Sequence, residues 1–405
     1  LCLLHSENPN KDIKKFDKKI IQKLKDEDFD FTAVYFPAQI EFPIDYQFTK
    51  ETSFSSTTFI NNANFFRSIF VEKANFDEVL FNEKAIFISV RFLKGADFSS
   101  TIFLKEARFF LASLSGEVIF FDTDFQDKAN FYGVILTENA KVFFGNIFTI
   151  KNSYKQKFHA DFSRLEIHPT ALLQFENICL SNVIFEHTDL RKINFYNVTW
   201  HRLWWRDALY DEFIINEKEN LRISSIIKQT SYIADVLPNL IANDLPERLG
   251  SDDYAAVEEL YRQLKINYEN EGDFKRVGDF HYGEKEMHRK ASKWRRFPFY
   301  WYNLYRWLSG YGERPSWALG WLALFLVGIA ALIWWLGLEV GHTTHLADFG
   351  DSFIYVLQKA TIQRPTWAEP VGFWGKMVAG FSVLIIPGQT ALFLLALRNR
   401  LGRRR

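Results

Sequence analysis

Two short groups of residues carry side chains that could bind a metal ion. Cys2 and His5 form a Cys-x-x-His pair, which supplies one thiolate and one imidazole ligand of the kind that Zn²⁺ takes. His281 and His288 lie seven residues apart with Glu284 between them. A structural zinc site normally has four ligands, and Cys2 and His5 supply only two, so whether they belong to a metal site stays open. For His281 and His288 a solvated polar face is the simpler interpretation. We therefore predict no metal site, no cofactor and no catalytic residue.

A third group of residues could line a path for ions. Thr361, Ile362, Gln363, Arg364 and Pro365 follow a short half-apolar helix that we predict at Phe349–Ala360, and they lie between two long apolar runs. Non-helical backbone at membrane depth is tolerated only where it is buried in protein or lines water. Four residues of the second apolar run fit the same interpretation, as a hinge (Pro387, Gly388) or as pore-lining side chains (Gln389, Thr390).

The two apolar runs that flank this loop are each long enough to span a bilayer. Ser316–Leu338 has twenty-three residues without a charge, which as a helix would extend roughly 34 Å. Met377–Leu397 is also uncharged, and tryptophans cluster towards the ends of the first run, where an aromatic belt is expected. The sequence predicts two transmembrane helices. The aromatic stretch at residues 297–315 is predicted to lie along the membrane surface as an amphipathic helix.

Near the two runs, lysine and arginine residues lie mainly on the outer flanks rather than in the loop between the runs. The basic residues before the first run are Arg289, Lys290, Lys293, Arg295, Arg296, Arg306 and Arg314. Those after the second are Arg398, Arg400, Arg403, Arg404 and Arg405, whereas the loop between the runs has Lys359, Arg364 and Lys376. The positive-inside rule then predicts that both termini lie in the cytoplasm. Our interpretation is a multi-pass protein of a bacterial-type inner membrane.

A helix, a short re-entrant helix with a loop, and a second helix make up the plan of two-span pore-loop ion channels, which residues 316–405 resemble. The resemblance implies a homo-oligomer, with a tetramer favoured, and Thr361–Pro365 at the filter position. The potassium filter TVGYG is absent, and Lys359 and Arg364 flank the loop. Conduction would therefore be weakly selective or would favour anions. The alternative is a helical hairpin that only anchors the rest of the chain.

Before residue 200 the chain contains an internal repeat. Any surface that the protein presents to the cytoplasm is expected to lie mainly on this repeat. Phenylalanines recur in two columns with a period of eleven residues, each with a small residue two positions earlier. This spacing fits neither an amphipathic helix nor a single strand, but it fits stacked coils that bury a shared core. The predicted core residues are Phe65, Phe70, Phe76, Phe81, Phe87, Phe92, Phe98, Phe103, Phe109, Phe120, Phe125 and Phe131.

Stretches such as Ala63-Asn64-Phe65, Ala96-Asp97-Phe98 and Ala160-Asp161-Phe162 resemble the A(D/N)Fxx units of the pentapeptide-repeat family. The resemblance covers about residues 48–200 and implies a right-handed, quadrilateral parallel β-helix. Ser113–Gly116 and Lys151–Gln156 disturb the pattern, so we expect bulges or loops there. Some members of this family mimic DNA, which requires a strongly acidic surface. Residues 48–200 hold 17 acidic and 16 basic residues, so nucleic-acid mimicry is not expected.

Composition agrees with a chain of several domains and no strong electrostatic field. The 405 residues include 49 Lys and Arg against 49 Asp and Glu, which argues against a nucleic-acid partner. Two cysteines cannot form a disulfide framework, and a reducing compartment is the simplest interpretation. The predicted domains are an N-terminal helical cap (1–47), the β-helix (48–200), a helical linker (201–296), the interfacial helix (297–315) and the membrane module (316–405).

Together these patterns predict a non-enzymatic membrane protein. The first interpretation is an oligomeric ion channel that contacts membrane lipid and a permeant ion. Its cytoplasmic repeat domain would serve for sensing or assembly. The alternative is a membrane-anchored scaffold that binds a cytoplasmic protein partner along the repeat.

Overall fold

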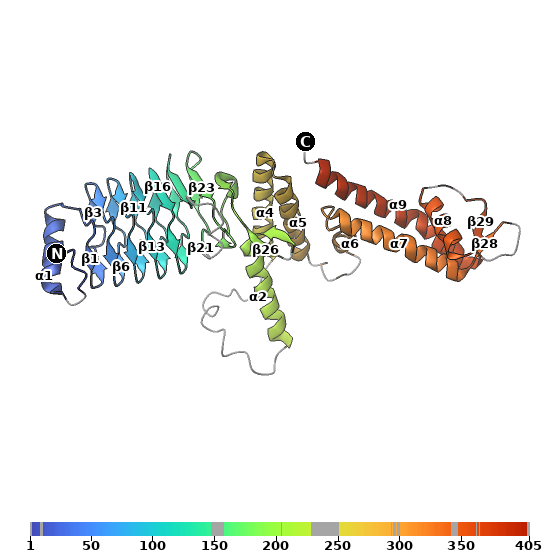
Figure 1. The fold of residues 1–405 in the computed structure, drawn as a ribbon, viewed down its shortest axis with the longest axis horizontal. Helices are drawn as coiled ribbons and strands as arrows, with labels where there is room; N and C mark the ends of the chain where they lie inside the picture. Colours follow the sequence, from blue (N-terminus) through green and yellow to red (C-terminus); the bar gives the residue numbers. More distant parts are fainter. Residues whose placement is uncertain are drawn as a thin grey trace. The chain divides into compact units, whose positions relative to one another are not determined.

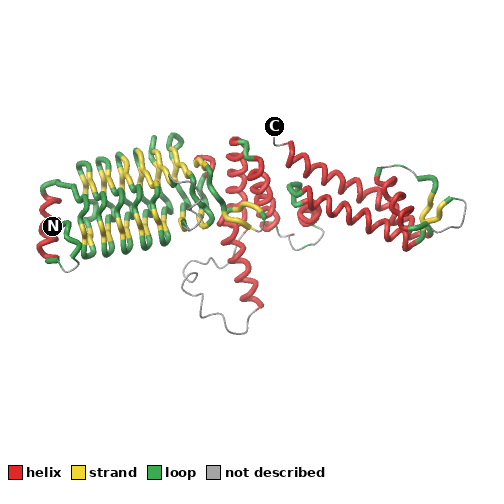
Figure 2. Tube along the Cα trace, viewed as in Figure 1, coloured by secondary structure: helices red, strands yellow, loops and turns green. Residues whose placement is uncertain are grey.

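The computed structural model describes residues 2–8, 11–146, 158–203, 205–227, 251–292, 294, 297, 300–341, 347–361, 363 and 365–402. The chain divides into two compact units, Leu1–Asn267 and Tyr268–Arg405. The first unit is a parallel β-solenoid closed by helices, and the second consists of helices with one short ribbon (Figures 1 and 2).

The strands of the solenoid join four parallel sheets in turn. Up to β20 every fourth strand is a neighbour in the same sheet, and in the last coils the neighbours are two or three strands apart because the first sheet ends at β17. The first sheet contains β1 (Tyr35–Phe36), β5 (Thr58–Phe59), β9 (Leu80–Phe81), β13 (Ile102–Phe103) and β17 (Asp124–Phe125). The second contains β2 (Ile40–Glu41), β6 (Ala63–Asn64), β10 (Ala85–Ile86), β14 (Ala107–Arg108), β18 (Ala129–Asn130), β21 (His159–Asp161) and β24 (Asn182–Ile184). The third contains β3 (Gln47–Phe48), β7 (Ile69–Phe70), β11 (Arg91–Phe92), β15 (Ser113–Leu114), β19 (Ile135–Leu136) and β22 (Glu166–Ile167). The fourth contains β4 (Thr52–Ser53), β8 (Ala74–Asn75), β12 (Gly95–Asp97), β16 (Glu117–Phe121), β20 (Lys141–Gly145), β23 (Leu172–Glu176) and β25 (Ile193–Tyr196).

The solenoid has about seven turns, and a regular turn takes 22 residues, as the pairing of Ala63 with Ala85 and of Ala85 with Ala107 shows. Each eleven-residue column of phenylalanines therefore alternates between two sheets and resolves into two ladders of stacked rings. In the ladder beside the fourth sheet, the Phe98 ring centroid lies 4.8 Å from that of Phe76 and 4.9 Å from that of Phe120. All twelve phenylalanines of the predicted core are at most 6% exposed. Burial of each ring contributes roughly 1.5–3 kcal/mol.

The Asn or Asp that follows the small residue shapes the corner of each coil. Asn64 Oδ1 accepts a hydrogen bond from the Phe66 N–H at 2.9 Å, and Asp161 Oδ1 accepts one from the Ser163 N–H at 3.0 Å. The residue after each such corner, for example Arg67, has a positive φ of about 50–60°. That backbone is costly outside glycine, but the Arg67 N–H donates to the Ile88 carbonyl of the next coil at 3.0 Å.

The start of the solenoid and one expected irregularity within it differ in detail from the sequence prediction. Strands β1 and β2 already belong to the sheets, so the solenoid begins at Tyr35 rather than at Phe48. Ser113–Gly116, where a bulge or loop was expected, keeps Ser113 and Leu114 in β15, and Gly116 turns the chain with a φ of +68°. The second expected irregularity, Lys151–Gln156, lies outside the described residues.

Helices and a pair of short antiparallel strands cover the two open ends of the solenoid. At the start, α1 (Ile13–Lys25) buries Phe16 and Ile20, and the Phe16 ring contacts Phe36 edge-on at 5.4 Å. At the other end, η2 (Leu190–Lys192) is followed by the antiparallel pair β26 (His201–Leu203) and β27 (Arg206–Ala208), and then by α2 (Tyr210–Ile227) and α4 (Ser251–Glu271). These elements shield the last apolar layer, which ends with Trp200.

In the second unit, α5 (Phe274–Ala291) and α6 (Trp301–Ser309) precede two long apolar helices, α7 (Pro315–Leu336) and α9 (Gly372–Gly402). Between the long helices lie β28 (Leu338–Val340), α8 (Phe349–Ala360) and β29 (Ala368–Pro370). Strands β28 and β29 pair antiparallel. The predicted short helix at Phe349–Ala360 is therefore present with the same bounds.

Candidate functional site

The long helices α7 and α9 form an antiparallel hairpin. At one end, Asn399 Nδ2 of α9 donates to the Gly312 carbonyl just before α7, at 3.1 Å. At the other end, the β28–β29 ribbon joins the last residues of α7 to the start of α9, which Figure 1 shows in orange and red. Both helices are long and apolar enough to cross a membrane, and fewer than a quarter of the residues in each apolar window are buried. The hairpin could thus span a membrane with both flanks on one side.

Helix α8 packs against both long helices near the ribbon end of the hairpin. Its buried residues are Ser352, Tyr355 and Val356. Tyr355 and Val356 belong to one apolar cluster with residues of the other elements, namely Ile329, Ala330, Ile333, Leu338, Ala347, Ala368, Ala379 and Ile386. The opposite face of α8 is apolar and open, with Phe349, Ile354 and Leu357 between 38% and 49% exposed. One chain therefore covers only half of this helix.

Local hydrogen bonds fix where α8 begins and ends. Asp348 caps the first turn, since its Oδ1 accepts from the Asp351 N–H at 2.8 Å in a capping box. At the other end the Thr361 hydroxyl donates to the Gln358 carbonyl at 2.9 Å. The Gln358 side chain also accepts from Trp367 Nε1 at 2.7 Å, which ties the returning chain to the helix.

The five predicted loop residues follow this helix directly. Thr361 and Gln363 are exposed in the single chain and Pro365 is half-buried, while Ile362 and Arg364 lie outside the described residues. The Gln363 N–H donates to the Gln358 carbonyl at 3.0 Å. The contacts of the three described residues do not place them around a common axis, so the role of this loop at a filter stays a prediction.

The predicted hinge and pore-lining residues lie in α9, in the part of the hairpin that faces the start of α7. Pro387 stands inside the helix, and Gly388 is exposed with open space where a Cβ would be. Gln389 is buried, and its Nε2 donates to the carbonyls of Leu308 at 3.0 Å and Ala318 at 2.8 Å. Thr390 donates its hydroxyl back to the Ile386 carbonyl. Within one chain Gln389 thus joins α9 to α6 and α7, and a pore-lining role for it stays a prediction.

A buried charged group, which we name the clamp, fixes α5 to the residues just before α7. It consists of Glu286, Arg289, Asn303, Arg306 and Tyr311. Arg289 Nη2 donates to Glu286 Oε1 at 2.7 Å, and the Tyr311 hydroxyl donates to Glu286 Oε2 at 2.8 Å. Arg289 Nη1 donates to Asn303 Oδ1 at 3.2 Å, and Arg306 Nε lies 3.7 Å from Glu286 Oε2.

The charges of the clamp compensate one another. Burial alone would raise the pKa of Glu286, but hydrogen bonds and charge from Arg289, with the nearby Arg306, lower its pKa to about 2. Burial, followed by the Glu286 charge, raises the pKa of Tyr311. A second pair outside the clamp, Arg314 Nη2 with Asp279 Oδ1 at 3.3 Å, connects α5 to the residue before Pro315. A displacement of α5 would therefore act directly on the start of α7.

Sequence reasoning did not find the clamp. Glu286 and Tyr311 are 25 residues apart, and no periodicity relates them. The one signal in the sequence was an acid and a base three positions apart on a helix, followed by the aromatic stretch at residues 297–315.

The candidate metal ligands make local contacts. Cys2 Sγ lies 3.0 Å from His5 Nδ1, and His281 Nδ1 lies 3.7 Å from Glu284 Oε2. The His288 ring packs beside Tyr302, with centroids 5.1 Å apart. Among the described residues, no group of three or more His, Cys, Asp or Glu side chains is arranged to hold a metal ion.

Comparison with known proteins assigns no family to the chain. No protein-family model, no curated protein and no solved structure matches it. The fold and the site geometry therefore have to support any functional conclusion by themselves.

Proposed function

We propose that the protein is a membrane-anchored β-solenoid of the pentapeptide-repeat type whose α7–α8–α9 hairpin assembles with further copies into an ion-conducting pore. The solenoid would be the right-handed, four-sided coil of that family, on the cytoplasmic side of a bacterial inner membrane. Through α5 and the clamp it would bias the gate, for which Pro387 and Gly388 are the proposed hinge. Several copies are needed, because two spans per chain cannot enclose a path, and four are favoured because the resemblance of residues 316–405 to two-span pore-loop channels implies a tetramer.

The position of α8 carries this proposal. If α7 crosses the bilayer, its 22 residues extend roughly 33 Å. The α7 residues that share a cluster with α8, from Ile329 to Ile333, lie in its last two turns. Helix α8 would therefore lie within the outer third of the membrane, too short to cross it and ending in non-helical backbone. Such backbone is stable at that depth only against protein or water, and a pore between copies provides both.

The open apolar face of α8 supports assembly of copies. Ile354 is 49% exposed and Leu357 is 41% exposed in one chain. A neighbouring copy would cover this face together with the exposed Thr361 and Gln363. Basic residues near both flanks of the hairpin, which the Asn399–Gly312 contact places at one end, support a cytoplasmic location for that end.

The test is ion flux through liposomes that contain the purified protein. A variant in which residues 349–365 are replaced by a flexible linker should lose the flux. Because Lys359 flanks the proposed path, K359Q should shift selectivity from anions towards cations. The matched control is K376Q, which removes an exposed lysine in the first turns of α9. It should leave selectivity unchanged. Absence of flux from the unmodified protein at every ion tested would reject the pore.

Exposed apolar side chains on the solenoid favour the second candidate, a membrane-anchored scaffold. Leu93, Leu111 and Ile135 are between 37% and 45% exposed on successive coils. A cytoplasmic protein partner could cover these positions. In this case the hairpin serves only as an anchor, and the protein would be monomeric and without flux.

A further inference from the structure

The solenoid unit contains a cavity of about 530 Å³ that the membrane hairpin does not involve. The second sheet forms one wall, and helices α2 and α4 form the others. Six charged side chains line it, namely Lys128, Asp161, Glu186, Asp211, Lys218 and Asp253. The cavity is large enough for a small organic molecule, which makes its lining chemically informative.

The walls of this cavity are held by buried hydrogen bonds. At the start of α2, Asp211 accepts from the Phe185 N–H at 3.0 Å. The next residue, Glu212, accepts from Arg206 Nη2 at 2.7 Å and also from the Tyr261 hydroxyl of α4, and all three side chains are buried. These bonds fix α2 and α4 to each other and to the end of the sheet.

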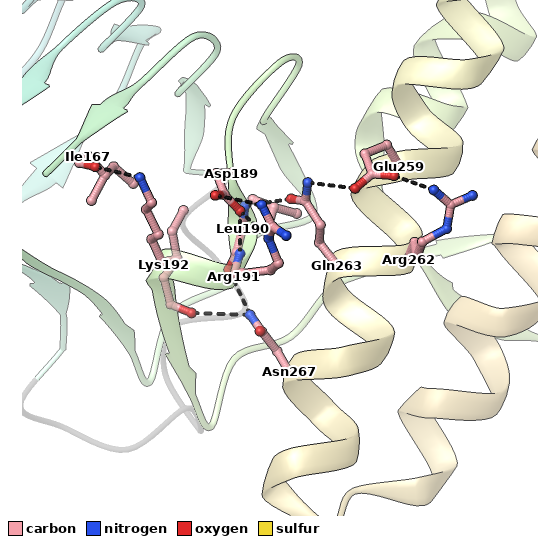
Figure 3. A network of polar contacts seen from close by, with 10 residues as sticks. Ile167, Asp189, Leu190, Arg191, Lys192, Glu259, Arg262, Gln263 and Asn267 are labelled. Atoms are coloured by element: carbon pink, nitrogen blue, oxygen red, sulfur yellow. Dashed lines mark hydrogen bonds and ion pairs between the residues drawn. The ribbon is translucent and has the colours of Figure 1, made fainter. Parts of the chain in front are cut away.

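Helix α4 has a second attachment to the solenoid, which Figure 3 shows. Gln263 Oε1 accepts from the Leu190 N–H at 2.8 Å, and Asn267 Nδ2 donates to the Leu190 carbonyl at 2.7 Å. Both bonds involve the backbone of Leu190 in the last coil. Helix α4 is therefore bound to the backbone of the solenoid itself. The cavity is therefore formed before any ligand binds.

The charges in the cavity select a cation with several charged groups. Asp211 is 4% exposed, and burial raises its pKa to about 7, so it carries at most part of a charge at neutral pH. The other three acidic side chains, Asp161, Glu186 and Asp253, still outnumber the two ammonium groups, so negative charge prevails. The carboxylates are spread over the sheet and both helices, and within the described residues no three of them are arranged around one metal ion. A ligand with separated positive charges matches this distribution better than a single ion.

Four aliphatic side chains line the same cavity beside the charged and polar ones. Ile184 of the sheet, Ile214 and Ile215 of α2 and Val257 of α4 all line the cavity. Hydrocarbon groups are favoured against such side chains, whereas a hydrated ion is not. We propose that this cavity binds an aliphatic polyamine, with its ammonium groups at the carboxylates and its methylene chain along the isoleucines and Val257. The proposal extends beyond the pore and does not depend on it.

The chain offers a matched pair of variants for the test. Asp161 of the second sheet and Asp97 of the fourth sheet both follow an inward alanine, and each accepts a hydrogen bond from the N–H two residues later at 3.0 Å. Asn64 and Asn130 make the same bond at equivalent corners, so Asp-to-Asn changes preserve the fold. D161N removes one charge from the cavity, and D97N removes one from another sheet.

Isothermal titration of the full-length protein in detergent with spermidine, putrescine and Mg²⁺ separates the outcomes. We expect saturable binding of one spermidine per chain, weaker binding of putrescine, and no competition by equimolar Mg²⁺. D161N should weaken spermidine binding roughly fivefold, and D97N should leave it unchanged. E186Q, at an exposed wall position, should weaken it less. No saturable binding, or an equal loss in D161N and D97N, would overturn the proposal whatever the flux experiment shows.

Discussion

The solenoid and the hairpin bury their large apolar side chains in opposite ways. Phe98 of the solenoid is completely buried inside one chain, whereas Leu324 of α7 is 57% exposed and Leu384 of α9 is 72% exposed. One chain is therefore sufficient to form the solenoid core in water. The hairpin is incomplete as a single chain in water and needs lipid or further copies to cover it. This difference agrees with α7 and α9 as the two helices that could span a membrane.

The largest expected effect separates the two regions by stability. F98A removes a ring that stacks on both neighbouring coils, and it should lower the free energy of unfolding by about 3–5 kcal/mol. L324A should change the free energy of unfolding by less than about 1 kcal/mol, because more than half of the Leu324 side chain is exposed and little of it packs against protein. Thermal unfolding in detergent, followed by circular dichroism, measures both. Equal losses in the two variants would contradict the comparison.

The clamp provides the next largest effect, since it lies in the hairpin unit but is buried like the solenoid core. E286A leaves Arg289 and Arg306 without their carboxylate and should cost about 3 kcal/mol. E72A removes an exposed partner of Lys94 on the solenoid and should cost less than about 1 kcal/mol.

The pH dependence of the clamp follows from the same contacts. Because the folded pKa of Glu286 is lowered to about 2, its stabilisation is present above the unfolded value near 4.5 and is lost as pH falls towards 2. In E286Q this loss should be absent. If E286Q kept the full acid sensitivity of the unmodified protein, the clamp would have no part in it.

Asp211 should show the opposite pH dependence. Its pKa is raised from 3.8 to about 7 by burial, so the folded state holds a proton that the unfolded state releases. The solenoid should therefore lose stability, on the order of 4 kcal/mol, as pH rises from 4 to 7. D211N keeps an acceptor for the Phe185 N–H and should remove this slope. Unfolding by denaturant at several pH values tests it, and an unchanged slope in D211N would assign the effect elsewhere.

The smallest effect concerns the corners of the coils. N75A removes the acceptor for the Asp77 N–H and should cost about 1 kcal/mol. N75D should be nearly neutral, because Asp97 makes the same bond one coil later. A neutral N75A would show that the turn does not depend on this side chain.

Much of the fold followed from short-range patterns in the sequence. The small-x-Phe spacing predicted the solenoid, since every coil repeats the same local requirement for a large and a small inward side chain. The half-apolar stretch before Pro365 predicted a short helix at Phe349–Ala360, and α8 has these bounds. Each of these features is local, so a single sequence contains it.

Contacts between distant residues could not be predicted in this way. The Arg206–Glu212–Tyr261 group joins residues up to 55 apart, and the clamp joins Glu286 to Tyr311. No period relates such residues, and charged side chains in a sequence are usually exposed. The cavity beside the second sheet was missed for the same reason, because three separate elements form its walls.

The central claim is that the hairpin is completed by other copies of the chain. The most direct measurement is the native mass of the full-length protein in lipid nanodiscs, with and without the I354K change on the open face of α8. The account predicts an oligomer, with four copies favoured, that dissociates when I354K places a charge on that face. A monomer in the unmodified protein, or an oligomer that is indifferent to I354K, would contradict it.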